Sequence, residues 1–407
     1  MSGSTFITAA WVIPVTAPPL RDGCVEVAGA RIVSVGSAPA ARPAGTNVID
    51  LGAAALMPGL VNPHTHLELG CYAGLLKPAP LWQWLARLVA LRAVPGQLPR
   101  ERAAVAEGAR CSLRAGVTCV GDISRRNIAW SVLKTLPIRK VCFVELLALA
   151  DHPPRNLDEL RAAVAGVAED ELLTVGISPH APYSVPAEQV RGAVALAAEL
   201  GRPWTMHVAE TEQEIAFLEG RSGALGRVFE KLLGQCGVCS PRQSPIEYLE
   251  RCTGGLRRGA LAHMNYVADG ELARLAGLGH TVVYCPRAHH FFGHGAHPFL
   301  KLRAAGVRVA LGTDSLASNS SLSLLDELHF VHTQVPGAPP PPELLRMATL
   351  EAAAALDLAD RIGSLEPGKQ ADLAAFPCPR HVTDPVRHVV ENPAAACAVW
   401  VAGRRFI

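Results

Sequence analysis

The sequence lacks the features that mark membrane, secreted and nucleic-acid-binding proteins. No apolar run approaches the roughly 20 residues of a membrane span, and the first residues lack the basic segment and unbroken apolar stretch of a secretory signal. No block of one charge is present, because 38 Lys and Arg balance 36 Asp and Glu to a formal net charge of +2. We therefore expect a soluble, cytoplasmic protein that binds neither a membrane nor nucleic acid. Whether it forms a homo-oligomer stays open.

A disulfide framework and a structural zinc site are also missing. The 11 cysteines are odd in number and scattered, and several lie inside apolar runs, for example Cys119, Cys142 and Cys285. That placement suits reduced, buried thiols. Cys236 and Cys239 form a CGVC, but no second pair stands at zinc-site spacing and no thioredoxin-like context surrounds it, which disfavours a redox or zinc role. With 49% hydrophobic residues over 407 positions, the chain can bury a large core.

The middle of the chain alternates helix-like stretches with short β-branched runs that end in polar residues. This alternation predicts parallel βαβ units. Eight strands close a (β/α)8 barrel, whereas an open doubly wound sheet is the alternative, although no GxGxxG follows the first strand. The eight runs are LMPGLVNPHTH (56–66), GVTCVGD (116–122), KVCFVELL (140–147), LLTVGISPH (172–180), PWTMHVAE (203–210), GALAHMN (259–265), HTVVYCP (280–286) and VRVALGTD (307–314).

The two ends of the chain differ from this middle. Residues 1–56 and 363–407 contain short strand-like runs separated by Gly and Pro turns. We expect these two segments to pair as one small β domain. The barrel of residues 57–362 would then be inserted between them.

Histidines and one aspartate mark the ends of four predicted strands. His64 and His66 stand one residue apart, so on an extended strand both imidazoles point to the same side. Alone, such a pair is more often packing than a metal site, but His207, His263 and Asp314 end three further strands. In a barrel these ends form one face, where active sites lie. Three nitrogens and one carboxylate suit Zn²⁺ or Fe²⁺ and leave a position for water.

Six motifs occur in order along nearly the whole chain: MPGLVNPHTH, PHAPYSV, MHVAETEQE, LAHMNYV, LGTDSLASN and GSLEPGKQADL. In this combination the chain resembles the amidohydrolase superfamily, and within it the chlorohydrolase and aminohydrolase branch that deaminates purines, pyrimidines and triazines. The resemblance implies a barrel with a small β-sandwich formed by both ends. It also implies one metal ion held by His64, His66, His207 and Asp314. Branches with two metals add a carboxylated lysine after the fourth strand, where this chain has SPHAPYS and no lysine.

A hydrolytic mechanism follows from these residues. A divalent ion, Zn²⁺ or alternatively Fe²⁺, lowers the pKa of its bound water toward ~7. Glu210 resembles the family's proton shuttle and would act as general acid and base, the alternative being that HVAE only opens a helix with an acidic first turn. His263 would orient and polarise the hydroxide. Asp314 would bind the metal and accept the proton of the water.

Substrate contacts are less firmly indicated. Glu68 directly follows the two histidines, a pattern that resembles aminodeoxyfutalosine deaminases, or it is a solvated loop residue. His180 matches a family position that contacts substrate, unless it is a structural histidine. Arg125 and Arg126 follow the second strand and Arg287 follows the seventh, on the predicted metal face. They would receive a substrate carboxylate, or they cap a helix and face water.

Two further stretches bear on the substrate. WLARLVALRAVPG lacks the glutamate that, in deaminases of S-adenosylhomocysteine and methylthioadenosine, binds ribose hydroxyls. Trp82 and Trp84 precede it, and they form either an aromatic wall for a flat base or part of the core. The run of His289, His290, His294 and His297 resembles a second metal site, but its irregular spacing on a glycine-rich loop favours a mobile rim of the active site.

The resemblance therefore implies hydrolytic release of ammonia from an aminated purine nucleoside, with 6-amino-6-deoxyfutalosine of the menaquinone route as first substrate. Guanine, S-adenosylhomocysteine, adenosine or a triazine, including dechlorination of the latter, is the runner-up. A non-catalytic barrel scaffold is the alternative from another class. A scaffold predicts missing ligands, and the sequence has all of them.

Overall fold

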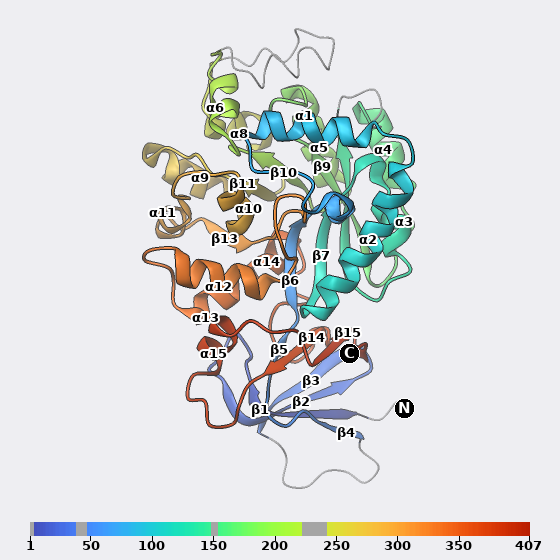
Figure 1. Ribbon diagram of the computed structural model, residues 1–407, viewed down its shortest axis with the longest axis vertical. Coiled ribbons are helices and arrows are strands. Elements are labelled where there is room, and N and C mark those ends of the chain that lie inside the picture. Colours follow the sequence, from blue (N-terminus) through green and yellow to red (C-terminus); the bar gives the residue numbers. More distant parts are fainter. Residues whose placement is uncertain (1–3, 38–46, 148–153, 222–241) are drawn as a thin grey trace.

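The computed structural model of the protein describes residues 4–37, 47–147, 154–221 and 242–407. Figure 1 shows two parts, a barrel wrapped by helices and, below it, a sheet that carries both ends of the chain. The CGVC of Cys236 and Cys239 lies outside the described residues. No helix within the described ranges combines the length and the apolar character that crossing a bilayer requires.

The barrel consists of two four-stranded parallel sheets, ordered β6-β7-β8-β9 and β10-β11-β12-β13. Single bridges join the two sheets into a ring, because Ile177 pairs with Trp204 and Thr65 pairs with Asp314, both parallel. The predicted (β/α)8 barrel is thus confirmed, and the open doubly wound alternative is wrong. The strands are β6 (Leu60–Thr65), β7 (Val117–Ile123), β8 (Arg139–Leu146), β9 (Leu173–Pro179), β10 (Thr205–Val208), β11 (Ala260–His263), β12 (Thr281–Tyr284) and β13 (Arg308–Leu311).

The barrel strands are buried on both faces, as expected when helices cover the outside and side chains fill the inside. Every residue of β7 and β8 is buried. The covering helices bury one stripe each; in α5 it consists of Val190, Ala193, Val194 and Ala197 at helical spacing. The helices are α1 (Leu81–Arg92), α2 (Gln97–Arg114), α3 (Ala129–Leu133), α4 (Leu157–Ala165), α5 (Ala187–Glu199), α6 (Glu212–Leu218), α8 (Pro245–Thr253), α9 (Leu272–Leu278), α10 (Pro286–Phe291), α11 (Phe299–Ala304), α12 (Leu324–Gln334), α13 (Pro341–Met347), α14 (Leu350–Ala355) and α15 (Pro385–Glu391).

Both ends of the chain meet in one eight-stranded sheet, ordered β16-β15-β14-β5-β1-β2-β3, with β4 paired to β1. This sheet has a core of its own, which includes Ile7, Val25, Leu56, Leu373 and Trp400. The small β domain is confirmed, although its strands form a single continuous sheet. Its division from the barrel at residues 56 and 363 stays a prediction. The strands are β1 (Thr5–Val12), β2 (Leu20–Ala28), β3 (Arg31–Ser37), β4 (Asn47–Asp50), β5 (Ala54–Pro58), β14 (Leu373–Pro377), β15 (Ala398–Val401) and β16 (Arg404–Arg405).

Gly59 is the point where the chain passes from the small sheet into the barrel. The run 56–66, expected to be one strand, is divided here between β5 and β6. A side chain at this position would clash, because a Cβ would lie 2.1 Å from Oγ1 of Thr118. The N–H of Gly59 donates to the carbonyl of Asp372 at 2.9 Å. Glycine thus allows the close approach of the two parts directly below the strand that carries His64.

Candidate active site

The four predicted metal ligands come together at the carboxyl ends of the barrel strands. His64 belongs to β6, His66 follows it, His207 belongs to β10, and Asp314 follows β13. The Nε2 atoms of His66 and His207 are 3.2 Å apart. Oδ1 of Asp314 lies 4.0 Å from Nε2 of His64 and 3.9 Å from Nε2 of His66. Within the part of the chain that the structure describes, His64, His66 and His207 are the one group of three side chains close enough to share an ion.

The hydrogen bonds of these imidazoles fit a metal ion at their centre. Nδ1 of His66 faces the carbonyl of Ile123 at 3.1 Å, and Nδ1 of His207 faces the carbonyl of His180 at 3.1 Å. A carbonyl only accepts, so each Nδ1 carries the proton and each Nε2 presents a lone pair. Two lone pairs 3.2 Å apart repel each other unless a cation lies between them. Both ring nitrogens of His64 are buried without a hydrogen-bond partner, which also fits a ligand role.

Burial keeps the three histidines neutral, the form that binds a metal. It lowers the pKa of His66 to about 3, with the nearby His207 as a further cause, and it lowers the pKa of His64 and His207 as well. Burial also raises the pKa of Asp314 to about 6, although Oγ of Ser318 donates to its Oδ2 at 2.7 Å.

The backbone is strained where these strands end. Asp314, His263 and Ala209 have φ values of 57°, 73° and 52°, in the left-handed region that side chains with a Cβ rarely adopt. Such residues collect at functional sites, where surrounding contacts hold them in place. Here they turn the chain out of β13, β11 and β10 toward the same space.

Glu210 and His263 lie beside the metal ligands and face each other. Nε2 of His263 is 3.7 Å from Oε1 of Glu210. Burial raises the pKa of Glu210 well above its usual value, with the nearby Asp314 and Glu214 as further causes. A protonated carboxyl can donate to a substrate nitrogen, which is what a general acid requires.

The main chain around Glu210 is fixed by two side chains. The carboxylate of Glu214 accepts the N–H of Ala209 at 2.7 Å with Oε1 and the N–H of Glu210 at 3.0 Å with Oε2. On the other side, Nδ2 of Asn265 donates to the carbonyl of Glu210 at 2.9 Å. The peptide groups on both sides of Glu210 therefore have fixed partners, and its side chain has a defined starting direction.

A cavity of about 340 Å³ opens onto these groups. Its size suits a ligand of nucleoside size. The ligands His66, His207 and Asp314, with Glu210 and His263, form one end. Helix α1 supplies much of the apolar wall of the cavity. Its contribution includes Leu81, Trp82, Trp84, Leu85, Leu88 and Val89, and Phe292 also lines the cavity. Trp82 and Trp84 thus both line the cavity, although Trp84 is buried and packs edge-to-face on Phe292 with ring centroids 5.5 Å apart.

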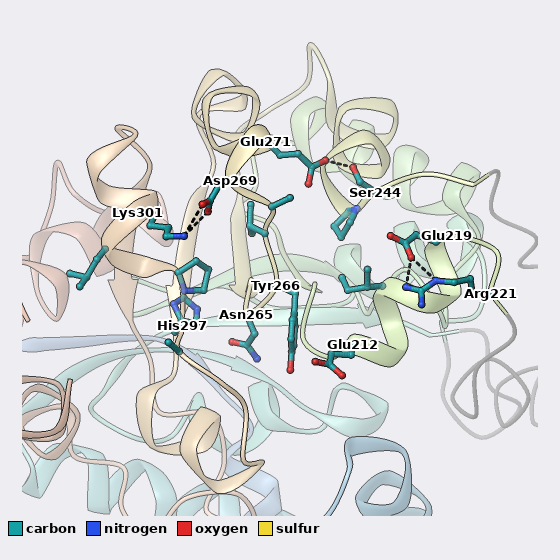
Figure 2. A pocket seen from close by; sticks show the side chains of 17 residues that line it. Glu212, Glu219, Arg221, Ser244, Asn265, Tyr266, Asp269, Glu271, His297 and Lys301 are labelled. Carbon is teal, nitrogen blue, oxygen red and sulfur yellow. Dashed lines mark hydrogen bonds and ion pairs between the residues drawn. The ribbon is translucent and has the colours of Figure 1, made fainter. Parts of the chain in front are cut away.

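A second hollow, of about 920 Å³, lies beside α6, α8 and α11 (Figure 2). It is larger, but both of its cationic side chains are paired: Nζ of Lys301 is 2.7 Å from Asp269, and Arg221 bonds Glu219. None of the predicted metal ligands lines it. The chemistry therefore belongs to the smaller cavity.

The predicted substrate contacts are only partly brought together. Glu68 and Arg125 line the cavity, but Arg92 bonds one carboxylate oxygen of Glu68 and the N–H of Arg125 bonds the other at 2.8 Å. Arg126 is exposed, on left-handed backbone with φ 54°. Arg287 is not in the lining, because its guanidinium bonds Ser320 and lies 3.7 Å from Asp326. Arg287 is therefore not part of the proposed substrate site.

His180 lies in the cavity wall, next to the metal ligands. Its ring centroid is 5.1 Å from that of His207, and its Nδ1 is 2.5 Å from Oγ of Ser184. Its carbonyl also accepts from His207, so it helps to orient a ligand in addition to facing the cavity.

The sequence does not predict two charged residues of the lining, Arg92 and Glu145. Arg92 ends α1 on the face that buries Leu81, Trp84 and Leu88, and it bonds Glu68 while lying 3.2 Å from Oε1 of Glu101. A charge that continues an apolar helical stripe was the available signal. Glu145 lines the cavity from near the end of β8, as the one acid inside the apolar run KVCFVELL.

The histidine run is not brought together as a candidate metal group. Across the described ranges, His289, His290, His294 and His297 belong to no group of three candidate ligands. The segment nevertheless reaches the active site, since Phe292 lies in the cavity wall.

Known proteins share this sequence and architecture. The chain is 31% identical over 392 residues to a 5-methylthioadenosine/S-adenosylhomocysteine deaminase of Nitratidesulfovibrio vulgaris, covering 91% of this chain and 83% of that protein. It is 32% identical over 305 residues to the aminodeoxyfutalosine deaminase of Deinococcus radiodurans, 70% of each chain. A solved adenosine deaminase of Xanthomonas campestris with bound zinc has a TM-score of 0.84 at 28% identity, covering 99% of this chain and 92% of that one.

The family profile agrees with the geometry. The profile described as the amidohydrolase family matches residues 55–404, which include the whole barrel and most of the C-terminal part of the small sheet. The chain belongs to the amidohydrolase family and is a hydrolase that acts on carbon–nitrogen bonds.

Proposed function

We propose that the protein hydrolytically deaminates a 6-aminopurine nucleoside, releasing ammonia, with 6-amino-6-deoxyfutalosine as the first substrate. One observation carries this proposal. The buried pair of Glu210 and His263, 3.7 Å apart, stands beside the cluster of His64, His66 and His207 at the end of a nucleoside-sized cavity. The names of the relatives, which are deaminases of adenosine derivatives, support the same reaction.

A single divalent ion, with Zn²⁺ proposed first and Fe²⁺ as the alternative, would be held by His64, His66, His207 and Asp314. When bound, such an ion lowers the pKa of water and so supplies a nucleophile at neutral pH. The carboxyl of Glu210, whose pKa is raised by burial, donates a proton to the purine ring nitrogen beside the amine. The resulting carboxylate takes up the proton that Asp314 receives from the attacking oxygen and passes it to the departing amine, which leaves as ammonia. His263 directs the attacking oxygen, and Asp314 accepts its proton.

The charged residues of the cavity suit a polar nucleoside tail. Its lining includes Glu68, Glu145, Arg92 and Arg125, of which Arg92 and Glu68 bond each other. Carboxylates accept hydrogen bonds from ribose hydroxyls, whereas a guanidinium binds a carboxylate in a charge-assisted pair. A nucleoside that carries both hydroxyls and an anionic group uses both kinds of side chain. This composition, together with the relative in Deinococcus radiodurans, supports the aminodeoxyfutalosine proposal over a free base.

The test is an ammonia-release assay on purified protein with one divalent ion added per chain. Aminodeoxyfutalosine, S-adenosylhomocysteine, methylthioadenosine, adenosine, adenine and guanine are compared by kcat/KM. We expect aminodeoxyfutalosine to rank first and the free bases last. A preference for guanine or for uncharged adenosine would overturn the substrate and keep the reaction. Absence of ammonia from every compound, in protein that holds its metal, would favour the non-catalytic scaffold.

A further inference from the structure

The histidine run between β12 and α11 has no part in the function proposed so far. Its last member, His297, lies in the wall of the hollow drawn in Figure 2, in which Asn265 and Tyr266 also take part. Its ring stacks on Tyr284, with centroids 3.9 Å apart and an interplanar angle of 22°. His297 therefore contacts the end of β11 from the hollow and does not line the cavity of the predicted metal ligands.

The two ring nitrogens of His297 have different partners, and these define its tautomer. Nδ1 accepts the backbone N–H of Phe299, the first residue of α11, at 3.0 Å. Nε2 lies 2.8 Å from the carbonyl oxygen of His263. Because Nδ1 accepts and a carbonyl can only accept, the single ring proton must be on Nε2. His297 thus donates to His263 as a neutral imidazole.

This bond fixes a strained part of the site. His263 has φ 73°, and its carbonyl belongs to the peptide group whose N–H, on Met264, donates to the carbonyl of Val208 at 3.0 Å. One peptide group is thus held at both ends, by His297 in the segment before α11 and by Val208 of β10. Without the donor from His297, the carbonyl of His263 loses its partner and the left-handed backbone can relax.

We propose that His297 is a positioning residue, whose Nε2–H holds the peptide after His263 and thereby keeps the imidazole of His263 directed at Glu210. The proposal rests on the function proposed above, in which His263 directs the attacking oxygen. His297 is not in the lining of the cavity onto which the metal ligands open. It acts through the main chain of His263 alone, while its Nδ1 separately supports the start of α11.

The two roles can be separated by amide substitutions. The amide group of glutamine reaches about where Nε2 of histidine stands, so His297→Gln keeps a donor for His263 and loses the acceptor for Phe299. The amide group of asparagine reaches about where Nδ1 stands, so His297→Asn keeps the acceptor and loses the donor. His290→Asn is the matched control, because His290 is exposed on the same segment.

We expect His297→Asn to lose about 10- to 100-fold in kcat, the cost of a misplaced reacting group, with a much smaller change in KM and with metal content retained. His297→Gln should keep most of kcat and unfold at a lower temperature. Equal losses in both folded variants, or full activity in His297→Asn, would overturn the proposal. If His297→Asn does not fold, a folded but inactive His297→Gln would overturn it equally.

A crystal structure of His297→Asn tests the same point without any substrate. We expect the φ of His263 to leave the left-handed region in this variant and to stay near its wild-type value in His297→Gln. An unchanged His263 in His297→Asn would contradict the proposal whatever the substrate is. A wild-type protein that releases no ammonia from the substrate panel would instead refute the proposed function, so the two failures can be told apart.

Discussion

The two ends of the barrel bury polar groups in opposite ways. At the amino end of β8, Arg139 and Asp372 form a pair in which all three guanidinium nitrogens donate, to Asp372 at 2.6 and 3.1 Å and to the carbonyl of Glu171 at 3.0 Å. Asp372 also accepts the N–H of Ala402 at 2.7 Å. At the carboxyl end of the barrel, His64 is buried with both ring nitrogens unpartnered.

This difference distinguishes polar groups that stabilise the fold from polar groups of the candidate active site. The pair of Arg139 and Asp372 joins the barrel to the small sheet, and its complete hydrogen bonding offsets the cost of burying two charges. The cluster around His64 has crowded imidazoles and left-handed backbone, and its hydrogen bonds leave both ring nitrogens of His64 without a partner. Buried polar groups without partners are rare in folded proteins, so the two unpartnered nitrogens of His64, beside the other predicted ligands, mark a site that binds and reacts.

The largest effect on activity and metal content is expected from removing one of the predicted metal ligands around His64. His66→Ala should abolish ammonia release and lower the metal content far below one ion per chain, because three ligands remain of four. The protein should stay folded by circular dichroism. Elemental analysis and the ammonia assay measure the two losses, and His381→Ala, an exposed histidine, serves as control. Two tightly held metals in the wild type would contradict the single site, as would metal retained in His66→Ala.

Removing one member of the pair of Arg139 and Asp372 should lower the unfolding free energy and leave kcat unchanged. Arg139→Ala leaves the carboxylate of Asp372 buried without its partner, which costs about 3 to 5 kcal/mol of unfolding free energy. Denaturant unfolding measures this loss. The folded fraction should keep its metal and its kcat. Replacing both residues, as Arg139→Met with Asp372→Leu, should recover part of the stability. A loss of kcat without a loss of stability in Arg139→Ala would contradict the distinction between a structural pair at the amino end of the barrel and an active site at its carboxyl end.

Glu210 is expected to matter for rate alone. Glu210→Gln keeps the shape of the side chain but cannot shuttle protons, so kcat should fall at least ~100-fold. Metal content should match the wild type. The unfolding free energy should not fall, because a buried carboxyl is replaced by a neutral amide of similar size. Near-normal turnover would assign proton transfer to another group.

The smallest effect on kcat is expected at Glu214, which both stabilises the local backbone and positions an active-site residue. In Glu214→Gln one of the two acceptor oxygens becomes a donor that faces a backbone N–H, and we expect kcat to fall about 10-fold, the cost of roughly one buried hydrogen bond. Glu212→Gln on the same helix is exposed and should have no effect. Added to Glu210→Gln, the Glu214 change should cost little more in kcat, because it acts through Glu210. Additive losses would show an independent role.

The sequence revealed the strands and the ligands because both signals are local. Apolar runs that end in His66, His207 or Asp314 can be recognised from a few neighbouring residues, and strand periodicity places their side chains. The division at Gly59 could not be seen in this way. It depends on the distance to Thr118, which only the packed structure contains.

Pairs between distant elements were likewise hidden. Glu68 was expected to face the substrate, but its partner Arg92 lies 24 residues further along the chain, on a helix whose orientation depends on tertiary packing. Arg287 follows a barrel strand as expected, yet a neighbouring carboxylate, Asp326, draws its guanidinium away. A sequence pattern can state which residues reach one face of a barrel. Which of them are already paired there is decided by contacts between elements.

The bridge between Thr65 and Asp314 has a consequence for the order of folding. It joins the first barrel strand to the last, and next to it Asn62 bonds Thr313 across 251 residues of sequence at 2.7 Å. Closing so long a loop costs more entropy than any pairing between neighbouring strands. His64 and Asp314 therefore come within reach of one ion only when the ring closes. Uptake of the ion during refolding would therefore report the closure of the barrel. A chain that ends before β13 could form every earlier strand and still bind no metal with this set of ligands.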